Sequence, residues 1–482
     1  MRSRVVIATV IALGLATASM LLPSAPTTDP WGWLIWGREI LHLDLSTAVA
    51  GSPSWKPLPV LVTTPLALLG GAAPTLWLVV SRAGALLSLA MGYRLAARLG
   101  GRSAGALAVL GLLLSTGWSL GVAHGYSEAF AMGLLFLAID RELDGRSGQA
   151  LLLGTAVALT RPEAWPLLCV VGALFWRRSQ VHPAFVLGPL VAVPLLWIVP
   201  DWIGSGQFLH GSHVSQAVAP TGGGASLDAL GGAAVIAPIP YGVCALAFPL
   251  FDDRGREGAY AGVALLSVSW GALLAILMFV AGYPATSRLF ALIAGLVCVL
   301  GAVGAAGLAA RLSPARPVLA TGLMVALAAV TVGLRAHPFL DGGRAALVHG
   351  RIASDLHDAI QRAGPATLRR CGRLRVPSGM GWARGVVAWD LHVPLRRVRG
   401  VRTSVRAYVV ELGAHRLDRA PPPPSRPVRV SRLRRKAVLF LPFQHAPLIR
   451  SRAAGTRMYE LAADGRWTVY AVGRPPCLRR AA

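Results

Sequence analysis

The sequence predicts an α-helical, polytopic membrane protein with a small α/β domain at its C-terminus. Of the 482 residues, 54% are hydrophobic and 14% are charged. The mean hydropathy of +0.57 is higher than that of ordinary water-soluble domains. The long apolar runs end near Leu334, after which Arg, Pro and Asp become frequent. We therefore expect a membrane domain over residues 1–335 and a water-exposed α/β domain over residues 336–482.

Apolar stretches that can cross a bilayer fill the first domain. A spanning helix satisfies its own backbone and needs about 20 apolar residues. By this criterion there are about eleven spans, at 5–23, 74–97, 104–122, 126–140, 148–160, 163–176, 184–200, 231–251, 259–281, 288–311 and 317–335. Three of them, 126–140, 148–160 and 163–176, are short, and short segments also occur as re-entrant or buried helices.

Residues 1–25 have a basic start, an apolar middle and small residues at the end. The same pattern describes a cleaved signal peptide. The run from Val5 to Leu22 is near spanning length, which favours an uncleaved first helix. A long first loop, 24–73, would then follow on the far side of the membrane, with Asp29 near its start.

The positions of the basic residues predict the orientation. Loops on the cytoplasmic side are enriched in Arg and Lys. An N-terminus in the cytoplasm places on that side Arg2, Arg4, Arg94, Arg98, Arg102, Arg141, Arg146, Arg177, Arg178, Arg254, Arg256, Arg311 and Arg316. The opposite loops hold few basic residues, namely Arg38, Lys56, Arg161 and Arg288. We expect a multi-pass plasma membrane protein whose C-terminal domain, after an odd number of spans, is extracytoplasmic.

The C-terminal domain combines one helical pattern with several strand patterns. Residues 347–364 have helical spacing and end at Gly-Pro, whereas "VRAYVVEL", "KAVLFLPF" and "WTVYAV" are typical of strands. The segment "APPPPSRP" (420–427) predicts a polyproline loop or spacer. Cys371 and Cys477 are the two cysteines of this domain, and in an extracytoplasmic setting they are candidates for a disulfide bond.

The net charge of +26 indicates that the protein binds anionic partners. Because the Arg residues are spread over loop ends and the C-terminal domain, nucleic acid is not expected, and anionic headgroups or phosphates are better candidates. The sequence contains no phosphate-binding Gly loop and no zinc-type Cys/His spacing. A nucleotide-driven enzyme and a bound metal are therefore not expected.

Polar residues gather in the segments that should face outward. These segments are the first loop, "VAHGYSEAF" (122–130), "ALTRPEAWP" (158–166), the loop 201–230 and "AGYPATSRLF" (281–290). If they converge, one outward cavity is lined by Asp29, Glu128, Glu163, His210, His213, Arg161 and Arg288.

Asp29 has two compatible interpretations. An Asp at the N-cap followed by Pro30 is an ordinary helix start. The helix that follows carries Trp31, Trp33 and Trp36, which predicts that it lies in the membrane interface with its tryptophans at headgroup depth. An Asp held there is also placed to accept a proton from a hydroxyl beside a lipid-borne donor.

The ionisable residues close to the membrane leave alternatives open. Arg161 and Glu163 could form a mutual ion pair beside Pro162, or Arg161 could grip a phosphate with its planar guanidinium. Arg288 could bind phosphate or extend to the surface.

The other candidate ligands of substrate or phosphate are weaker. Arg82 lies within an apolar run and could bond to Glu128 or to a lipid phosphate. Glu128 could cap its helix or face water. Lys56 lies in the first loop and could face water or contact phosphate. His210 and His213 could bind a substrate hydroxyl, but two histidines without a third ligand are weak support for a metal.

The sequence resembles the GT-C superfamily in four stretches, "DPWGWLIWGREI", "SPSWKPLPVL", "ALTRPEAWP" and "GYPATSRLF". It also resembles this superfamily in having about eleven spans and a long first loop with an acidic residue near its start. This superfamily comprises integral-membrane glycosyltransferases that use polyprenyl-phosphate sugars, such as actinobacterial mannosyl- and arabinosyltransferases and lipid A aminoarabinose transferases. The resemblance covers residues 1 to about 335.

The resemblance implies an inverting transfer in which Asp29 deprotonates the acceptor and Arg288 and Arg161 neutralise the leaving polyprenyl phosphate. Members with paired acids differ from this chain, where the acid nearest to Asp29 is Glu39, and this difference weakens any role for a metal. The implied partners are a lipid-linked hexose or pentose donor, the membrane, and a glycan, glycolipid or protein acceptor. Two other hypotheses remain open, a flippase or transporter of lipid-linked sugars and a non-catalytic cell-envelope assembly protein.

Overall fold

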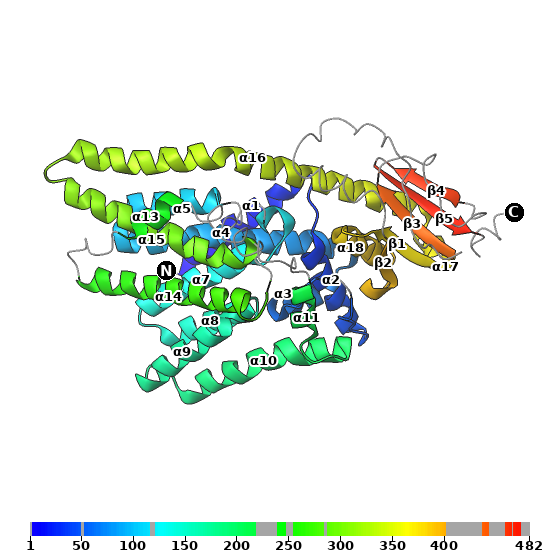
Figure 1. Cartoon of the computed structure of the whole chain (residues 1–482), viewed down its shortest axis with the longest axis horizontal. Coiled ribbons are helices and arrows are strands. Elements are labelled where there is room, and N and C mark those ends of the chain that lie inside the picture. The colour runs from blue at the N-terminus through cyan, green and yellow to red at the C-terminus, as the bar shows by residue number, and fades with distance from the viewer. Residues whose placement is uncertain are drawn as a thin grey trace.

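The computed structural model describes residues 2–49, 53–115, 121–217, 239–246, 254–283, 287–401, 436–442, 458–464 and 466–473. A long helical body occupies most of the molecule, and a domain with a mixed sheet caps one end of it (Figure 1). The predicted fold class, a helical multi-pass membrane protein with a small C-terminal α/β domain, is confirmed.

Five helices of the described residues are long and apolar enough to cross a membrane. They are α4 (Ala73–Gly100), α10 (Pro183–Ser205), α14 (Arg254–Phe279), α15 (Ala291–Leu312) and α16 (Pro317–Ala363). Shorter helices follow other predicted spans, namely α1 (Arg2–Ala18), α5 (Arg102–Leu113), α7 (Glu128–Leu143), α8 (Ser147–Ala158) and α9 (Trp165–Arg177). The predicted span 231–251 lies largely outside the described residues, and the number eleven is not confirmed.

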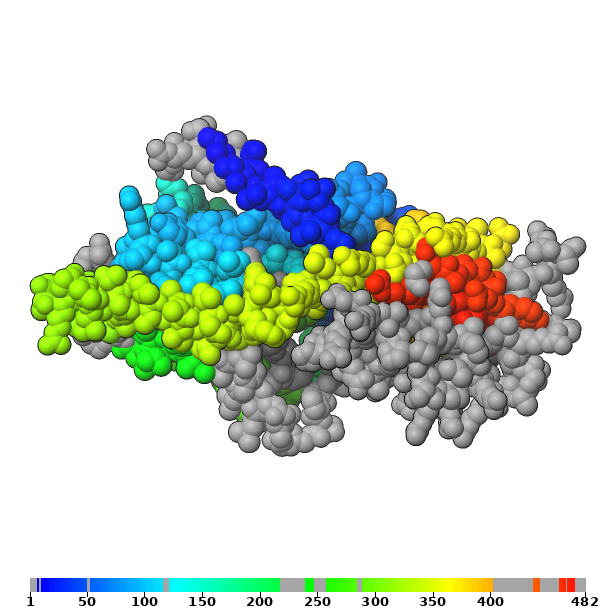
Figure 2. Space-filling view, turned by 90° about the horizontal axis from the view of Figure 1, so that it is seen from above, coloured from blue at the N-terminus to red at the C-terminus, as the bar shows by residue number. Residues whose placement is uncertain are grey.

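Helix α15 forms the centre of the helical body. It packs against α4, α5, α7 and the short helix α13 (Ile239–Ala245). Its small residues allow this, because an added Cβ at Gly301 or Gly304 would overlap the backbone of α13. Helix α1 lies on the outside of the bundle against α4 (Figure 2).

The first loop forms two helices, α2 (Thr28–Leu41) and α3 (Pro57–Ala67). The predicted helix start is wrong by two residues, because Thr27 is the N-cap and Asp29 lies in the first helical turn. The carboxylate still lies at the positive end of the helix dipole. The expected interfacial placement of the tryptophans is also wrong.

Trp31, Trp33 and Trp36 are buried within the protein. The indole N–H of Trp33 donates to Ser54 O at 2.9 Å, and that of Trp36 donates to Ser46 O at 3.0 Å. The surface of α2 that would have met headgroups is instead covered by α3 and by the C-terminal domain.

Helix α16 connects the two parts without a break, since its 47 residues run through the expected boundary at residue 335. It ends at Ala363 with Gly364 as its C-cap, as the Gly-Pro signal predicts. The five-stranded sheet that follows has the order β2-β1-β3-β5-β4. Its strands are β1 (Arg373–Pro377), β2 (Val398–Val401), β3 (Lys436–Pro442), β4 (Met458–Asp464) and β5 (Trp467–Gly473).

Strands β1 and β2 are parallel and are joined through α18 (Gly381–Asp390). Helix α18 packs directly on α2, and Gly385 makes this approach possible because an added Cβ would overlap the side chain of Trp31. Arg38 reinforces the contact by donating to the carbonyl oxygens of Ala388, Trp389 and Val393. The first loop and the C-terminal domain therefore share one hydrophobic core.

The remaining predictions for the C-terminal domain have mixed outcomes. The predicted strands "KAVLFLPF" and "WTVYAV" correspond to β3 and β5. The segments "VRAYVVEL" and 420–427 lie outside the described residues. Cys371 is disulfide-bonded, while Cys477 lies outside the described residues, so the predicted pairing stays a prediction.

Candidate functional site

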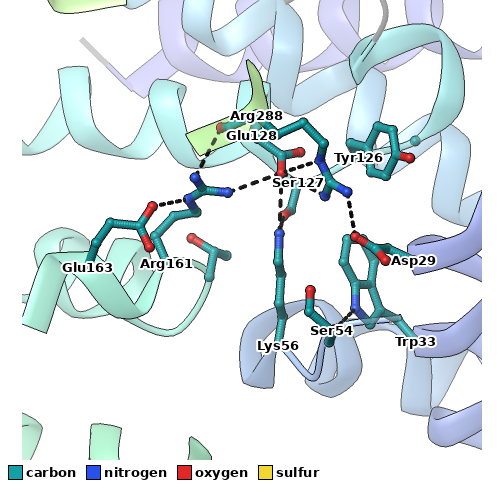
Figure 3. A network of polar contacts seen from close by, with 12 residues as sticks. Asp29, Trp33, Ser54, Lys56, Tyr126, Ser127, Glu128, Arg161, Glu163 and Arg288 are labelled. Carbon is teal, nitrogen blue, oxygen red and sulfur yellow. Dashed lines mark hydrogen bonds and ion pairs between the residues drawn. The ribbon is translucent and has the colours of Figure 1, made fainter. Parts of the chain in front are cut away.

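Five segments that are distant in sequence bring six charged side chains together (Figure 3). Asp29 comes from the first turn of α2, Lys56 immediately precedes α3, and Glu128 begins α7. Arg161 and Glu163 belong to the turn between α8 and α9, and Arg288 lies in the 3-10 turn before α15. Helix starts and tight turns fix all of these positions, so the side chains converge at one end of the helical body.

Glu128 is the centre of this charged network. Its Oε1 accepts from Lys56 Nζ at 3.3 Å, from Arg161 Nη1 at 3.1 Å and from Arg288 Nη2 at 2.7 Å. Its Oε2 is buried and has no hydrogen-bond partner among the described residues. Because the side chain of Glu128 is only 2% exposed, its negative charge is stabilised mainly by these cations.

Asp29 enters the network through Arg288. Arg288 Nη1 donates to Asp29 Oδ2 at 2.6 Å, and the guanidinium stacks on the ring of Tyr126 with 3.6 Å from its carbon to the ring centroid. The Arg288 side chain is 31% exposed and the Asp29 side chain 12%, whereas the other four charged side chains are at most 5% exposed. Asp29 and Arg288 therefore form the accessible edge of the network.

Arg161 links the two remaining members. Its Nε donates to Glu163 Oε1 at 2.6 Å, and its Nη2 donates to the backbone O of Arg288 at 3.0 Å. The mutual ion pair expected for Arg161 and Glu163 is therefore present, and the same guanidinium also bonds to Glu128. With three acids and three cations, the network is formally neutral.

Lys56 is buried rather than solvated. Its ammonium group donates to Ser127 Oγ at 3.1 Å and lies 5.2 Å from the ring centroid of Trp33. Burial lowers the pKa of Lys56 to about 8, and the carboxylate of Glu128 acts in the opposite direction. The expectation that Lys56 faces water is wrong, because the loop folds back on the start of α7.

Other predicted site residues lie elsewhere. Arg82 bonds to the backbone O and Oγ of Ser19 and to Ser24 Oγ, so its expected bond to Glu128 does not form. It holds the start of the first loop against α4. His210 and His213 lie in α11 (His210–Ala217), where His210 Nδ1 contacts Gln207 Oε1 at 3.3 Å.

No contact within the described residues joins the two histidines to the network. Across the same described ranges, no group of three or more His, Cys, Asp or Glu side chains could hold a metal ion. The structure also adds Tyr126 and Ser127, which sequence reasoning missed. Their position beside Glu128 in "GYSEAF" was a signal that a closer reading could have used.

An apolar cavity of about 430 Å³ lies between α7, α8, α9 and α14. Leu135, Leu168, Phe175 and Trp270 contribute to its walls. Ala164, the immediate neighbour of Glu163, also lines it. The cavity therefore reaches the turn that carries Arg161 and Glu163.

Comparison with solved structures clarifies the architecture. The apo structure of ArnT from Cupriavidus metallidurans aligns with a TM-score of 0.58 and 17% identity, covering 98% of each chain. The structure of the same protein bound to undecaprenyl phosphate aligns with a TM-score of 0.56 and 16% identity, covering 97% of this chain and 98% of ArnT. Both structures have the fold that the resemblance to the GT-C superfamily implies for this chain.

This chain has the GT-C fold. The alignment includes the C-terminal domain as well as the helical body, since nearly all of both chains is covered. No protein-family model and no curated protein matches the sequence. At this level of identity the likeness concerns the fold, and any activity has to be argued from the site.

Proposed function

We propose that the protein is an inverting glycosyltransferase that moves a sugar from a polyprenyl-phosphate donor to a glycan, glycolipid or protein acceptor of the cell envelope. The observation that carries this proposal is the contact between Asp29 and Arg288 at the accessible edge of a buried, formally neutral charged network. It places a general base beside a cation suited to phosphate.

In the proposed reaction, Asp29 accepts the proton of the acceptor hydroxyl. The hydroxyl oxygen attacks the anomeric carbon of the donor sugar, the bond from that carbon to the phosphate oxygen breaks, and the configuration inverts. Polyprenyl phosphate leaves with the electron pair of this bond. Arg288 compensates the charge that develops on it, as preorganised cations do at other phosphate sites.

The network explains how Arg288 is held ready for this role. Glu128 accepts two of its N–H groups, from Nε at 3.0 Å and Nη2 at 2.7 Å, which fixes the plane of the guanidinium. Arg161 and Lys56 lie behind it and supply further positive charge. Arg288 Nη1 points to Asp29, so the phosphate and the base are expected to share this guanidinium.

The surroundings of the site suit a lipid-linked donor. A polyprenyl phosphate keeps its chain in an apolar environment and its charged head at the membrane surface. The apolar cavity provides such an environment, and it reaches the turn of Arg161 and Glu163 through Ala164. ArnT, whose fold this chain resembles, has been captured with undecaprenyl phosphate.

We also propose an orientation with the N-terminus in the cytoplasm and the site on the outer face of the plasma membrane, as the loop charges favour. A divalent metal has no part in this mechanism. The donor sugar is a hexose or a pentose, and a mannosyl donor is one member of this class.

The test is transfer from a radiolabelled polyprenyl-phosphate hexose or pentose by the purified protein in lipid nanodiscs. Asp29→Asn should reduce kcat by roughly 10²- to 10⁴-fold, because it removes the base while keeping the shape. Asp341→Asn, which makes the same substitution at an exposed acid of α16, is the control and should leave kcat unchanged.

Two outcomes would contradict the proposal. One is an Asp29→Asn protein that keeps most of its turnover. The other is movement of the lipid-linked sugar across proteoliposome membranes without any glycosidic product, which would instead indicate a flippase.

A further inference from the structure

Six exposed arginines gather on one part of the C-terminal domain. Arg369 and Arg370 end the short helix α17 (Pro365–Cys371), and Arg373 begins β1 directly after it. A 3-10 turn that leads into β2 contributes two more, and β2 itself contributes one. The arginine surface, as we name it, consists of Arg369, Arg370, Arg373, Arg396, Arg397 and Arg399.

The strand register brings the two halves of this surface together. In the parallel pair of β1 and β2, Leu374 is the partner of Val398, so the residues just before them, Arg373 and Arg397, lie at the same end of neighbouring strands. Such strands are about 4.8 Å apart. Leu374 and Val398 are both buried. Because side chains alternate along a strand, the adjacent Arg373 and Arg399 lie on the opposite, exposed face.

Within the described residues, the positive charge of this surface is largely uncompensated by acidic side chains. Acids of the C-terminal domain pair with other basic residues: Asp355 with Arg466, Asp390 with His357 and Asp464 with Arg362. Among the described residues, the ion pair that reaches the surface joins Arg396 to Asp44 at 3.4 Å, and both of its side chains are more than half exposed. Exposed pairs of this kind contribute little, because water and salt screen their attraction.

A local effect of this charge is visible at His392, which precedes the turn that leads into β2. Burial lowers the pKa of His392, and the positive charges of Arg38 and Arg369 lower it further. Arg369, although it comes from α17, therefore lies close enough to the 392–397 segment to act on it.

The position of the surface relative to Asp29 limits the kind of partner. Asp44 pairs with Arg396 and lies just beyond the end of α2, whereas Asp29 lies in its first turn. The helical rise makes this separation roughly 18 Å. The C-terminal domain, which carries this surface, caps one end of the helical body, so the surface lies beyond the end of the helices that a bilayer would surround (Figure 1).

We infer that the arginine surface binds an extended acidic glycan, which is the acceptor of the proposed transfer. A row of guanidinium groups suits a polymer that carries carboxylates or phosphates at intervals, because each planar fork can bind one oxyanion. A chain that spans the surface and α2 can place a hydroxyl at Asp29 while its acidic groups remain on the arginines. The role of this glycan as the acceptor rests on the proposed function, whereas its binding to the arginine surface does not.

Binding can be measured without any transfer, which separates this inference from the proposed function. The full-length protein in nanodiscs of neutral lipid is titrated with an oligogalacturonate of about 12 sugars, with its fully methyl-esterified and therefore uncharged form, and with poly(glycerol phosphate). The carboxylate and phosphate probes distinguish the two sources of acidic groups. Asp29→Asn protein should bind equally well, because Asp29 is remote from the surface.

Two triple variants divide the surface into its two arms. Each variant, R369Q/R370Q/R373Q and R396Q/R397Q/R399Q, should weaken binding of an acidic probe by about tenfold, since it removes three exposed charges. The control is R102Q/R177Q/R316Q, which removes the same charge from exposed positions at helix ends of the body. It should change the Kd by less than about twofold.

Four results would overturn the inference. The first is equal binding of the esterified, uncharged probe. The second is a control triple variant that loses as much affinity as the two surface variants. The third is full binding by both surface variants. The fourth is binding to vesicles of anionic lipid that depends on the same arginines while neither acidic polymer binds, which would indicate a membrane contact instead.

Discussion

The charged network makes one prediction that its geometry allows to be worked in detail. Glu128→Gln keeps the size and one acceptor oxygen of the side chain but removes its charge. Lys56 Nζ, Arg161 Nη1 and Arg288 Nη2 lie at 3.3, 3.1 and 2.7 Å from the oxygen that would lose this charge. The network would change from three acids and three cations to two acids and three cations.

The expected cost is large because the excess cation is buried. Breaking a buried ion pair by removing one partner costs about 3 to 5 kcal/mol. Since Arg288 is 31% exposed and water can relax around it, we expect the lower end of this range, about 3 kcal/mol. For a chain of 482 residues that corresponds to a fall in Tm of roughly 3 °C, because the unfolding entropy increases with chain length.

A second substitution should partly reverse this loss. Lys56→Met removes a buried cation and should cost about 2 kcal/mol alone, because it leaves Glu128 with two cations instead of three. In the Glu128→Gln/Lys56→Met protein the charges balance again. The double variant should therefore lose about 2 kcal/mol less than the sum of the single losses.

The assay is thermal unfolding of the four proteins in nanodiscs, followed by intrinsic fluorescence and analysed as a double-mutant cycle. Glu142→Gln, the same substitution near the other end of α7, is the control. Glu142 has no ion pair among the described residues and should tolerate the change. The argument from charge balance would be refuted if the loss of stability of the double variant equals the sum of the two single losses to within about 0.5 kcal/mol.

Two further predictions concern the contact between α2 and the C-terminal domain. Burial raises the pKa of Glu39 from 4.5 to about 7, so the folded chain binds its proton more tightly and loses stability as pH rises through this window. The shift of about 2.5 corresponds to roughly 3 kcal/mol, so thermal unfolding should show Glu39→Gln more stable than wild type at pH 8 and nearly equal at pH 4.5. An equal difference at both pH values would contradict this. Gly385→Ala should lower the free energy of unfolding by about 1 to 3 kcal/mol, because its added Cβ overlaps the side chain of Trp31. It should also reduce the rate of sugar transfer, because Trp31 is only two residues after Asp29 on α2. Gly343→Ala, at a helical glycine with open space around it, should leave both unfolding and transfer unchanged.

Much of the fold follows from local patterns in the sequence. The predicted span 74–97 corresponds to α4, and the predicted helix end at Gly-Pro corresponds to the end of α16. Apolar length and turn residues act over one helix, so they can be recognised without knowing what packs nearby. The strands β1 and β2 were missed because each is at most five residues long, and so short a run of alternating residues is hard to tell from a loop.

Part of the site was also predictable. Arg161, Glu163 and Arg288 were predicted because a charge near the membrane requires a partner or a function. Asp29 was predicted because it lies at a helix start just after the first span, where it could accept a proton. The partners themselves were not predictable. Arg288 and Asp29 are 259 residues apart, and only packing of α15 and α2 on the same bundle end brings them to 2.6 Å.

The sequence by itself determined the membrane class of the protein, most of its helices and the supply of acids and cations near one end of the bundle. Only the tertiary structure decided that Lys56 is buried, that Arg82 bonds to Ser19 and Ser24, and that the tryptophans of α2 are buried within the protein instead of facing lipid. The physical reason is that hydropathy records how much a residue avoids water. Whether protein or lipid replaces that water depends on which segments meet, and those segments are distant in the chain.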